Sequence, residues 1–361
     1  MYKKLITVMV YISANRGDKM EKEYVLDFAR KLLEIDSPSG YTKKAIQFVE
    51  EEAKRLGYET QTSQKGNLWI TIKGKSNEKT IGLCAHCDTL GLMVRSIKSD
   101  GKLAITKIGG PIMPTLDGEY CRIHTRDQKV YTGTILSTSS AIHVYPDAST
   151  KTRDVDQMEV RIDEIVHSKE DTIALGIQNG DIIAIDPKVE ITNSGFIKSR
   201  FLDDKISVAA LMGVLKHMAT HQIQPQYDII VMISTYEEVG HGMSYIPSQI
   251  SELLAVDMGC IGLDLACTEQ MVSICAKDSS GPYDYDLTSH LISLAKKENL
   301  NYAVDIYPQY GSDVTAARNG GNDIRGALIG PGVHASHGME RTHIDGVINT
   351  MKLILAYLTN A

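Results

Sequence analysis

Two predominantly apolar segments set the strongest limit on the fold of this chain. They read TIGLCAH (80–86) and DIIVMIS (228–234), and both are short. The first is apolar enough for a strand buried on both faces, and the second also indicates a buried strand. Helical patterns stand between the strand-like segments, most clearly at residues 206–221 and 344–358. Strands that alternate with helices predict an α/β domain.

The character of the sequence changes over residues 106–197. Short strand-like segments follow one another there, separated by the turn signals LDG, QNGD and DP. This pattern favours a small all-β module. A chain of 361 residues is long enough for two domains or for one domain with an insertion. We therefore expect an α/β domain made of residues 20–105 and 198–361, with a β domain inserted at 106–197.

Composition excludes several classes of function. The net charge of −7 and the absence of a basic stripe argue against nucleic-acid binding. No apolar run approaches the ~18–20 residues of a membrane span, so we expect no membrane insertion. The six cysteines are spread along the chain, unlike the dense pattern of a disulfide-stabilised secreted domain. A reducing cytoplasm is the expected location.

The first 19 residues do not fit the rest of the chain. KKLITVMVYISA imitates a weak signal peptide, but its apolar run is short and the helical pattern begins only after Met20. NRGDKM can be encoded by a purine-rich ribosome-binding sequence placed just before Met20. We expect residues 1–19 to be a non-native or mis-assigned extension, which mass spectrometry of the natural protein would test.

Residues able to do chemistry gather in five short stretches at strand ends or in the loops that follow. They are AHCDTLG with His86 and Asp88, RFLDDKIS with Asp203 and Asp204, YEEVGHG with Glu237 and Glu238, IGLDLAC with Asp264, and HASHGMERTH with His334, His337 and His343. In open α/β sheets, sites form outside the carboxyl ends of the strands. Imidazole and carboxylate together suit zinc and similar ions. Each stretch alone is weak evidence, but five in this order indicate a site.

The adjacent glutamates Glu237 and Glu238 pose a geometric problem. On a regular strand, neighbouring side chains point to opposite faces. The two can converge only if the backbone turns, and Gly240 and Gly242 are consistent with a turn or bulge there. The alternative is a polar strand end with two solvated glutamates.

Several of these motifs resemble those of one enzyme family. The segments are SPSGYTKKA, AHCDTLGLMV, FLDDK, YEEVG, YGSDVTAA and SHGME. They resemble the tetrahedral, or deblocking, aminopeptidases of metallopeptidase family 42, which include glutamyl aminopeptidases. The resemblance covers nearly the whole chain after Met20. It implies a mixed-sheet α/β/α catalytic domain of zinc-peptidase type, with an inserted β-barrel-like domain that serves oligomerisation and access to the active site.

The resemblance also implies a metal site. Two divalent cations, zinc or cobalt, would be held by His86, Asp203, Glu238, Asp264 and His337. Asp203 would bridge them, with His86 and Asp264 on one cation and Glu238 and His337 on the other. The cations' four positive charges would meet three carboxylates and a bridging hydroxide, and a neutral cluster costs less to hold in a desolvated pocket.

Two further residues receive catalytic roles from the resemblance. Glu237 would act as general base on the metal-bridging water and then pass the proton to the leaving amine. Asp88 would fix the ring of the liganding His86.

Two residues leave alternatives open, and two positions depart from the family pattern. Asp204 could replace Asp203 as a ligand, and Asp313 either borders the substrate pocket or starts a helix. Lys205 stands where the family usually has arginine, so it keeps the charge but not the planar fork. The family often has a basic-aromatic pair before its last histidine, whereas this chain has GPGVHAS.

The function expected from this resemblance is an aminopeptidase that removes N-terminal residues from short peptides. It would work as a homo-oligomer, based on dimers and up to a dodecamer. The alternatives are another co-catalytic metal amidohydrolase, such as a carboxypeptidase or deacylase, or a non-catalytic metal-binding scaffold. Glycosidase chemistry is disfavoured by the histidines. Cys84 and Cys87 also have the C-x-x-C spacing of redox or zinc sites, but no second pair stands at a suitable distance.

Overall fold

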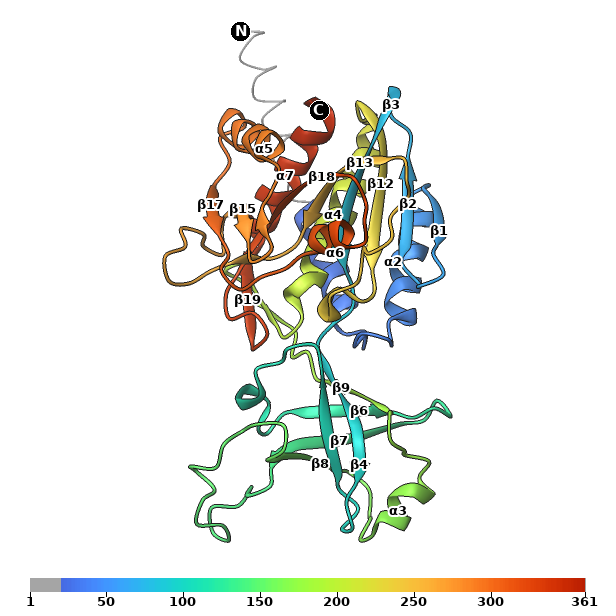
Figure 1. The fold of residues 1–361 in the computed structure, drawn as a ribbon, viewed down its shortest axis with the longest axis vertical. Coiled ribbons are helices and arrows are strands. Elements are labelled where there is room, and N and C mark those ends of the chain that lie inside the picture. The colour runs from blue at the N-terminus through green and yellow to red at the C-terminus, as the bar shows by residue number, and fades with distance from the viewer. Residues whose placement is uncertain (1–20, 361) are drawn as a thin grey trace.

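The computed structural model describes residues 21–360, so the expectation for residues 1–19 lies outside the described part of the chain. Figure 1 shows two bodies, a large α/β domain and a small barrel below it. The chain leaves the α/β domain after β3 (Ser76–His86), builds the barrel and returns before α4 (Leu202–His221). The expected insertion of a β domain into an α/β domain is therefore present.

A ten-stranded mixed sheet forms the centre of the α/β domain. Its strands run in the order β1 (Glu59–Thr62), β2 (Leu68–Ile72), β12 (Tyr227–Ser234), β3, β13 (Ile250–Val256), β18 (Arg325–Val333), β15 (Val272–Asp278) and β16 (Gly281–Pro282), while β14 (Gly259–Cys260) pairs with β18 and β17 (Tyr302–Ile306) with β15. The neighbours β12, β3, β13 and β18 are parallel. The flanking pairs β12–β2 and β18–β15 are antiparallel. The mixed-sheet fold class is confirmed.

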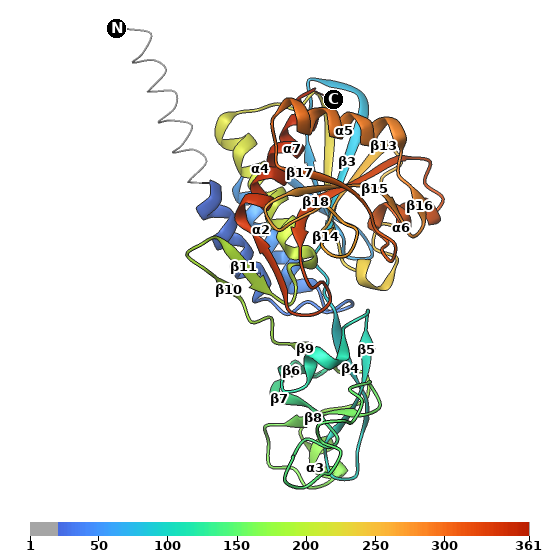
Figure 2. The same cartoon turned by 90° about the vertical axis from the view of Figure 1, so that its left-hand side faces the viewer.

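Helices cover both faces of this sheet (Figures 1 and 2). One face packs against helical residues 21–33, α2 (Lys43–Arg55), α4, α5 (Tyr285–Lys297) and α7 (Ile344–Asn360), and the other against α6 (Asp313–Asn319). Alternate residues of the central strands serve the two cores. In β12, Val231 belongs to the first and Met232 to the second, and Leu83 and Cys84 of β3 divide in the same way. Both segments are apolar throughout because both faces are covered.

The small domain is a closed barrel. Its strands run in the order β4 (Gly91–Ile97), β5 (Leu103–Ile108), β8 (Met158–Ile162), β7 (Val130–Ser137), β6 (Tyr120–His124) and β9 (Ile182–Ile185). The 3-10 turn η1 (Met113–Leu116) and the short helix α3 (Lys169–Ala174) lie in its connections. Closure pairs the edge strands with each other and so leaves the barrel no free edge.

The barrel boundaries differ from the predicted 106–197. The barrel strands span 91–185, because β4 pairs with β5 and β9 and not with the large sheet. Residues 190–199 belong with the α/β domain instead. There β10 (Glu190–Ile191) and β11 (Phe196–Ser199) form a small sheet with β19 (Glu340–His343). The apolar start of β4 resembles a strand of the large sheet, and only its pairing places it in the barrel.

A partly buried ionic cluster ties the two domains together. The Asp36 carboxylate accepts hydrogen bonds from Arg122 Nε and Nη2 at 2.7 Å each and from His124 Nε2 at 2.8 Å. Both of these partners lie on barrel strand β6, whereas Asp36 follows the first described helix of the α/β domain. Within residues 21–360, none of the helices combines the length and the apolarity needed to cross a bilayer.

Candidate metal centre

Four parallel strands bring the candidate residues to one edge of the sheet. His86 is the last residue of β3, and Asp257 follows directly on β13. The turn η2 (Glu237–Val239) comes just after β12, and His337 lies in the loop after β18. Because parallel strands end at the same edge, residues far apart in sequence meet there. Asp203, at the start of α4, completes the group.

Asp203 lies between two imidazoles. Its Oδ1 is 3.1 Å from His86 Nε2, and its Oδ2 is 3.6 Å from His337 Nε2. His337 Nε2 is also 3.8 Å from Glu238 Oε2. Donor atoms of His86, Asp203 and Glu238 all lie within 4.8 Å of one another. A carboxylate that offers one oxygen to each of two histidines has the arrangement required of a bridge between two cations.

The backbone turn expected at the paired glutamates is present. Glu237 and Glu238 lie in the 3-10 turn η2, which ends at Gly240 with φ of 84°. Glycine suits this left-handed conformation because it has no Cβ. Both glutamates therefore face the cluster, and Glu237 Oε2 lies 3.6 Å from His86 Nε2. The alternative of two solvated glutamates does not fit this geometry.

Asp88 holds both this turn and the histidine. Its carboxylate accepts the backbone N–H groups of Glu237 at 3.1 Å and Glu238 at 3.3 Å. The ring Nδ1 of His86 lies 2.9 Å from the backbone oxygen of Asp88 and 3.6 Å from its carboxylate. Donation from Nδ1 leaves Nε2 free to act as a ligand. Asp88 is fully buried and supports the cluster from behind.

Glu340 plays a similar part and was missed by sequence reasoning. Its two carboxylate oxygens accept the backbone N–H groups of Asp203 and His337, each at 3.0 Å. The His337 ring is fixed from the other side, where Nδ1 lies 2.9 Å from the Gly110 carbonyl oxygen. Glu340 is the last residue of the motif SHGME, and its place in that motif could have identified it as part of the site.

Asp264 is not part of the cluster, which corrects the predicted ligand set. It lies in an exposed loop beside Leu263 and lines a different cavity with Val304 and Ile306. Asp257 occupies the expected place, with a carboxylate within 4.8 Å of His86 donor atoms. The sequence also contained the signal for Asp257, a carboxylate at the end of an apolar strand. Asp257 directly follows the apolar run LLAV, which ends a buried strand.

Asp204 faces away from the bridge position. Its Oδ2 accepts the backbone N–H of His86 at 3.2 Å, while its Oδ1 has no hydrogen-bond partner. One of its oxygens also lies within 4.8 Å of donor atoms of His86 and Asp257. Asp203 remains the better bridge because its two oxygens face two different histidines. The adjacent Lys205 is fully buried, donates to the Ile35 carbonyl at 2.6 Å, and has its pKa lowered to about 8 by burial.

The remaining candidate residues lie outside the cluster. Asp313 is buried outside the cavity, where it accepts hydrogen bonds from Ser234 Oγ and, at 2.9 Å, from the Met243 backbone N–H. It thus anchors both ends of the segment that carries the paired glutamates. His334 is exposed, His241 stacks on Tyr236, and His343 lies 2.8 Å from the Ser194 carbonyl.

The cysteine pair gives no support to a redox or zinc-clip reading. Cys84 and Cys87 are both buried, and they pack into opposite cores of the sheet. Burial raises the pKa of the Cys87 thiol to about 12 and that of Cys84 well above its ordinary value. A reactive cysteine needs the opposite shift.

The crowded carboxylates show that the cluster suits cations. Burial, together with neighbouring carboxylates, raises the pKa values of Glu237 and Glu238 well above their usual range and that of Asp257 to about 7. Glu238 Oε1 is buried without a hydrogen-bond partner. Unpaired buried carboxylates are costly, and coordinated cations would remove that cost. The donor set of imidazole nitrogens and carboxylate oxygens fits zinc and similar divalent ions.

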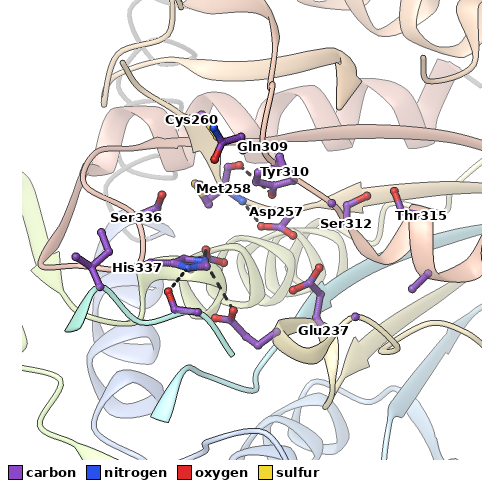
Figure 3. A pocket seen from close by; sticks show the side chains of 17 residues that line it. Glu237, Asp257, Met258, Cys260, Gln309, Tyr310, Ser312, Thr315, Ser336 and His337 are labelled. Carbon is purple, nitrogen blue, oxygen red and sulfur yellow. Dashed lines mark hydrogen bonds and ion pairs between the residues drawn. The ribbon is translucent and has the colours of Figure 1, made fainter. Parts of the chain in front are cut away.

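The cluster forms the floor of a cavity of about 490 Å³. Figure 3 shows Glu237, Asp257 and His337 around the same space, with the segment of Gln309 and Tyr310 above and Ser312 and Thr315 of the α6 region to one side. Gly110 and Ile112, from the loop after barrel strand β5, also line it. Residues of both domains therefore line the cavity.

Comparison with known proteins identifies the family. The model of the M42 glutamyl aminopeptidase family matches residues 66–353. The chain belongs to the M42 peptidase family. A Bacillus subtilis (strain 168) relative named "Putative aminopeptidase YhfE" is 47% identical over 334 residues, which cover 92% of this chain and 96% of the relative. The resemblance inferred from the motifs is thereby confirmed, and this M42 chain is a peptide hydrolase.

Solved structures confirm the fold of this M42 peptidase. An aminopeptidase from the archaeon Desulfurococcus kamchatkensis has a TM-score of 0.84 at 21% identity, with 94% of this chain and 96% of that chain covered. The Pyrococcus horikoshii TET1 peptidase, described as able to assemble into a tetrahedron or a large octahedral shell, has a TM-score of 0.82 at 22% identity over 93% of this chain and all of that chain. At these identities the likeness concerns the fold alone.

Proposed function

We propose that this M42 chain is an aminopeptidase that uses two divalent cations and Glu237 to release N-terminal residues from short peptides. The observation that carries the proposal is Asp203, whose two oxygens face two different histidines on the floor of one cavity. A second carboxylate, Glu237, faces the same cavity from a turn held by Asp88. Asp203 and the two histidines can hold metal, while Glu237 can transfer a proton.

The ligand set that we propose replaces Asp264 with Asp257. His86 and Asp257 would hold one cation, Glu238 and His337 the other, and Asp203 would bridge them. When bound, two such cations would polarise the scissile carbonyl group and activate water. The three carboxylates and a hydroxide balance the four positive charges of two divalent cations, as a buried cluster requires. Zinc and cobalt are the expected metals.

Glu237 is the proposed general base and acid. Its carboxylate would take the proton of the attacking water and deliver it to the nitrogen of the leaving amine. Asp88 keeps the carboxylate in place, because it binds the backbone N–H of Glu237 itself. The acidic surroundings would also favour a substrate with a free, protonated N-terminus.

A homo-oligomer is the proposed working form. The D. kamchatkensis and P. horikoshii proteins share the fold, and the latter can assemble into a tetrahedron or a large octahedral shell. In this chain, loop residues of the barrel expose large apolar side chains, with Ile142 62% and Val144 69% accessible. Exposed apolar groups on one segment favour contact with another subunit. Dimers, and a dodecamer built from them, are the expected assemblies, which light scattering would test.

The direct test combines metal analysis with a substrate panel. The purified protein is expected to bind two equivalents of zinc or cobalt and to hydrolyse peptides with a free N-terminus. The same peptides with an acetylated N-terminus should stay intact. Cleavage of blocked peptides would instead indicate a deacylase or another amidohydrolase, and metal binding without any hydrolysis would indicate a scaffold.

A further inference from the structure

The walls above the metal centre carry no charge that could pair with a charged substrate side chain. We propose that this enzyme selects peptides with an uncharged N-terminal residue and discriminates against both acidic and basic ones. This inference rests on the proposed function, because it assumes that the N-terminal residue enters the cavity. It departs from the glutamyl preference that the family description names.

The lining of the cavity divides into a charged floor and neutral walls. The floor is Asp203, Glu237, Glu238, Asp257 and His337, all of which the proposed function assigns to metal or proton transfer. The wall side chains described by the structure are apolar, hydroxyl, thiol or amide groups: Ile112, Met258, Cys260, Gln309, Tyr310, Ser312, Thr315, Ala316 and Ser336. Within the described residues, neither lysine nor arginine lines any side of this cavity.

An acidic N-terminal side chain would therefore enter without a counter-charge. In the proposed function the cations would be balanced by three carboxylates and a hydroxide, so they offer little net attraction to another anion. Glu237 lies beside them as a further acidic group. Moving a carboxylate out of water into such surroundings costs free energy that no partner returns. The result holds whichever part of the wall receives the side chain, because neither lysine nor arginine lines the cavity within the described residues.

Three basic side chains of neighbouring segments are engaged in other contacts. Lys65 donates to the carbonyl of His241 and to Ser244 Oγ at 2.8 Å, and it lines a separate cavity beside α2. Lys277 donates to a backbone carbonyl at 2.8 Å. Arg318 lies over the ring of Tyr283. None of these three side chains lines the substrate cavity.

A basic N-terminal side chain finds no free anion in the walls either. The carboxylate behind the α6 wall is Asp278, which is fully buried. Its oxygens already accept hydrogen bonds from Tyr283 at 2.7 Å, Thr315 at 3.1 Å and the Ser280 backbone N–H at 2.8 Å. The Thr315 hydroxyl stands between this carboxylate and the cavity. A lysine or arginine side chain would have to displace these hydrogen bonds to reach it.

An uncharged side chain meets suitable partners instead. Met258 and Ala316 offer apolar contact, and methionine adapts to different shapes. Gln309 can donate to or accept from an amide. The walls thus suit leucyl, methionyl or glutaminyl residues, which bury surface in the cavity without requiring an ion pair.

Three matched substrates test the proposal. We would measure kcat/KM of the zinc- or cobalt-loaded enzyme for leucyl, glutamyl and lysyl p-nitroanilides. The leucyl compound is expected to exceed both others by at least about tenfold, which corresponds to about 1.4 kcal/mol. A glutamyl or lysyl value equal to or above the leucyl value would overturn the proposal.

A wall variant tests the cause. Gln309→Lys places an ammonium group on the wall, whereas Gln309→Met has similar length and no charge. The ratio of glutamyl to leucyl kcat/KM is expected to rise at least about fivefold in Gln309→Lys compared with Gln309→Met. Equal ratios in the two variants would show that the missing counter-charge does not set the selectivity.

Product binding separates this inference from the proposed function. Calorimetry on the metal-loaded protein would compare L-leucine, L-glutamate and L-lysine as ligands. A protein that hydrolyses none of the anilides contradicts the aminopeptidase proposal, yet tighter binding of leucine would still support the selectivity of the cavity. Tighter binding of glutamate or lysine would contradict the selectivity even in an active enzyme.

Discussion

The carboxylates at the domain junction and those at the sheet edge have opposite electrostatics. At the domain junction, Asp36 is surrounded by donors from Arg122 and His124. Burial alone would raise the pKa of Asp36, but these hydrogen bonds outweigh it and lower the pKa to about 2. At the sheet edge, Glu238 and Asp257 crowd other acids, and burial raises their pKa values. The Arg122 guanidinium supplies positive charge at the junction, whereas the crowded carboxylates at the sheet edge fit the cations that we propose there.

The largest expected effect on metal content and turnover distinguishes Asp257 from Asp264, the two candidates for one ligand position. Asp257→Ala should lose one of two bound metal ions and lower turnover by more than ~10²-fold, because a direct ligand is removed. Asp264→Ala should keep both ions and near-normal turnover, since Asp264 lies in an exposed loop. Metal analysis and steady-state kinetics on the pair measure this, and the reverse pattern would restore the original assignment.

Removing the proposed base should separate catalysis from metal binding. Glu237→Gln keeps the size of the side chain but cannot accept the proton of water. Turnover should fall by at least ~10²-fold while metal content stays normal. His337→Ala should lose metal instead. A Glu237→Gln enzyme of ordinary activity would exclude the assigned role.

Metal removal should destabilise the sheet edge and leave the junction unaffected. Zinc at about 100 times its dissociation constant is expected to stabilise the folded protein by about 2.7 kcal/mol for each site that it fills. Asp257→Ala should lose part of this gain, whereas Asp36→Asn should keep it. Thermal unfolding with chelator and with added zinc measures the difference. If zinc stabilises the wild type, Asp257→Ala and Asp36→Asn equally, the cations bind elsewhere.

The smallest expected effect concerns acid stability at the junction. Because its pKa falls from 3.8 to about 2 on folding, Asp36 stabilises the protein above pH ~4 and loses this contribution as the pH falls toward 2. The shift corresponds to about 2.5 kcal/mol. Asp36→Asn should therefore be less stable than the wild type near pH 5, and the difference should shrink toward pH 2. Denaturant titration of metal-free proteins at several pH values would show it, and a constant difference would contradict it.

Local patterns predicted most of the elements correctly. The apolar segments at 80–86 and 228–234 are parallel neighbours β3 and β12, and the last helical pattern is α7. These predictions succeed because burial of one or both faces of an element sets the spacing of apolar residues along its sequence. The turn at the paired glutamates was also predictable, since two adjacent side chains cannot share a face of a strand.

The errors concern pairings between distant segments. Asp257 and Asp264 both stand close after the same strand, and sequence reasoning selected the second. Only the register of β13 against β3 and β18 shows that Asp257 reaches the edge where His86 ends its strand. The barrel boundary failed for a related reason, because β4 looks like a sheet strand until its partners are known.

By itself, the sequence determined the kinds of elements, their order and the residue types that stand where buried strands end. The tertiary structure decided which of those residues meet: Asp257 and not Asp264, with Glu340 holding Asp203 and His337 from behind. The physical reason is the range of the forces involved. The pattern of buried residues within a helix or strand depends on residues that are close in sequence. A metal centre depends on distances of a few ångströms between distant segments, which only the pairing of strands brings together.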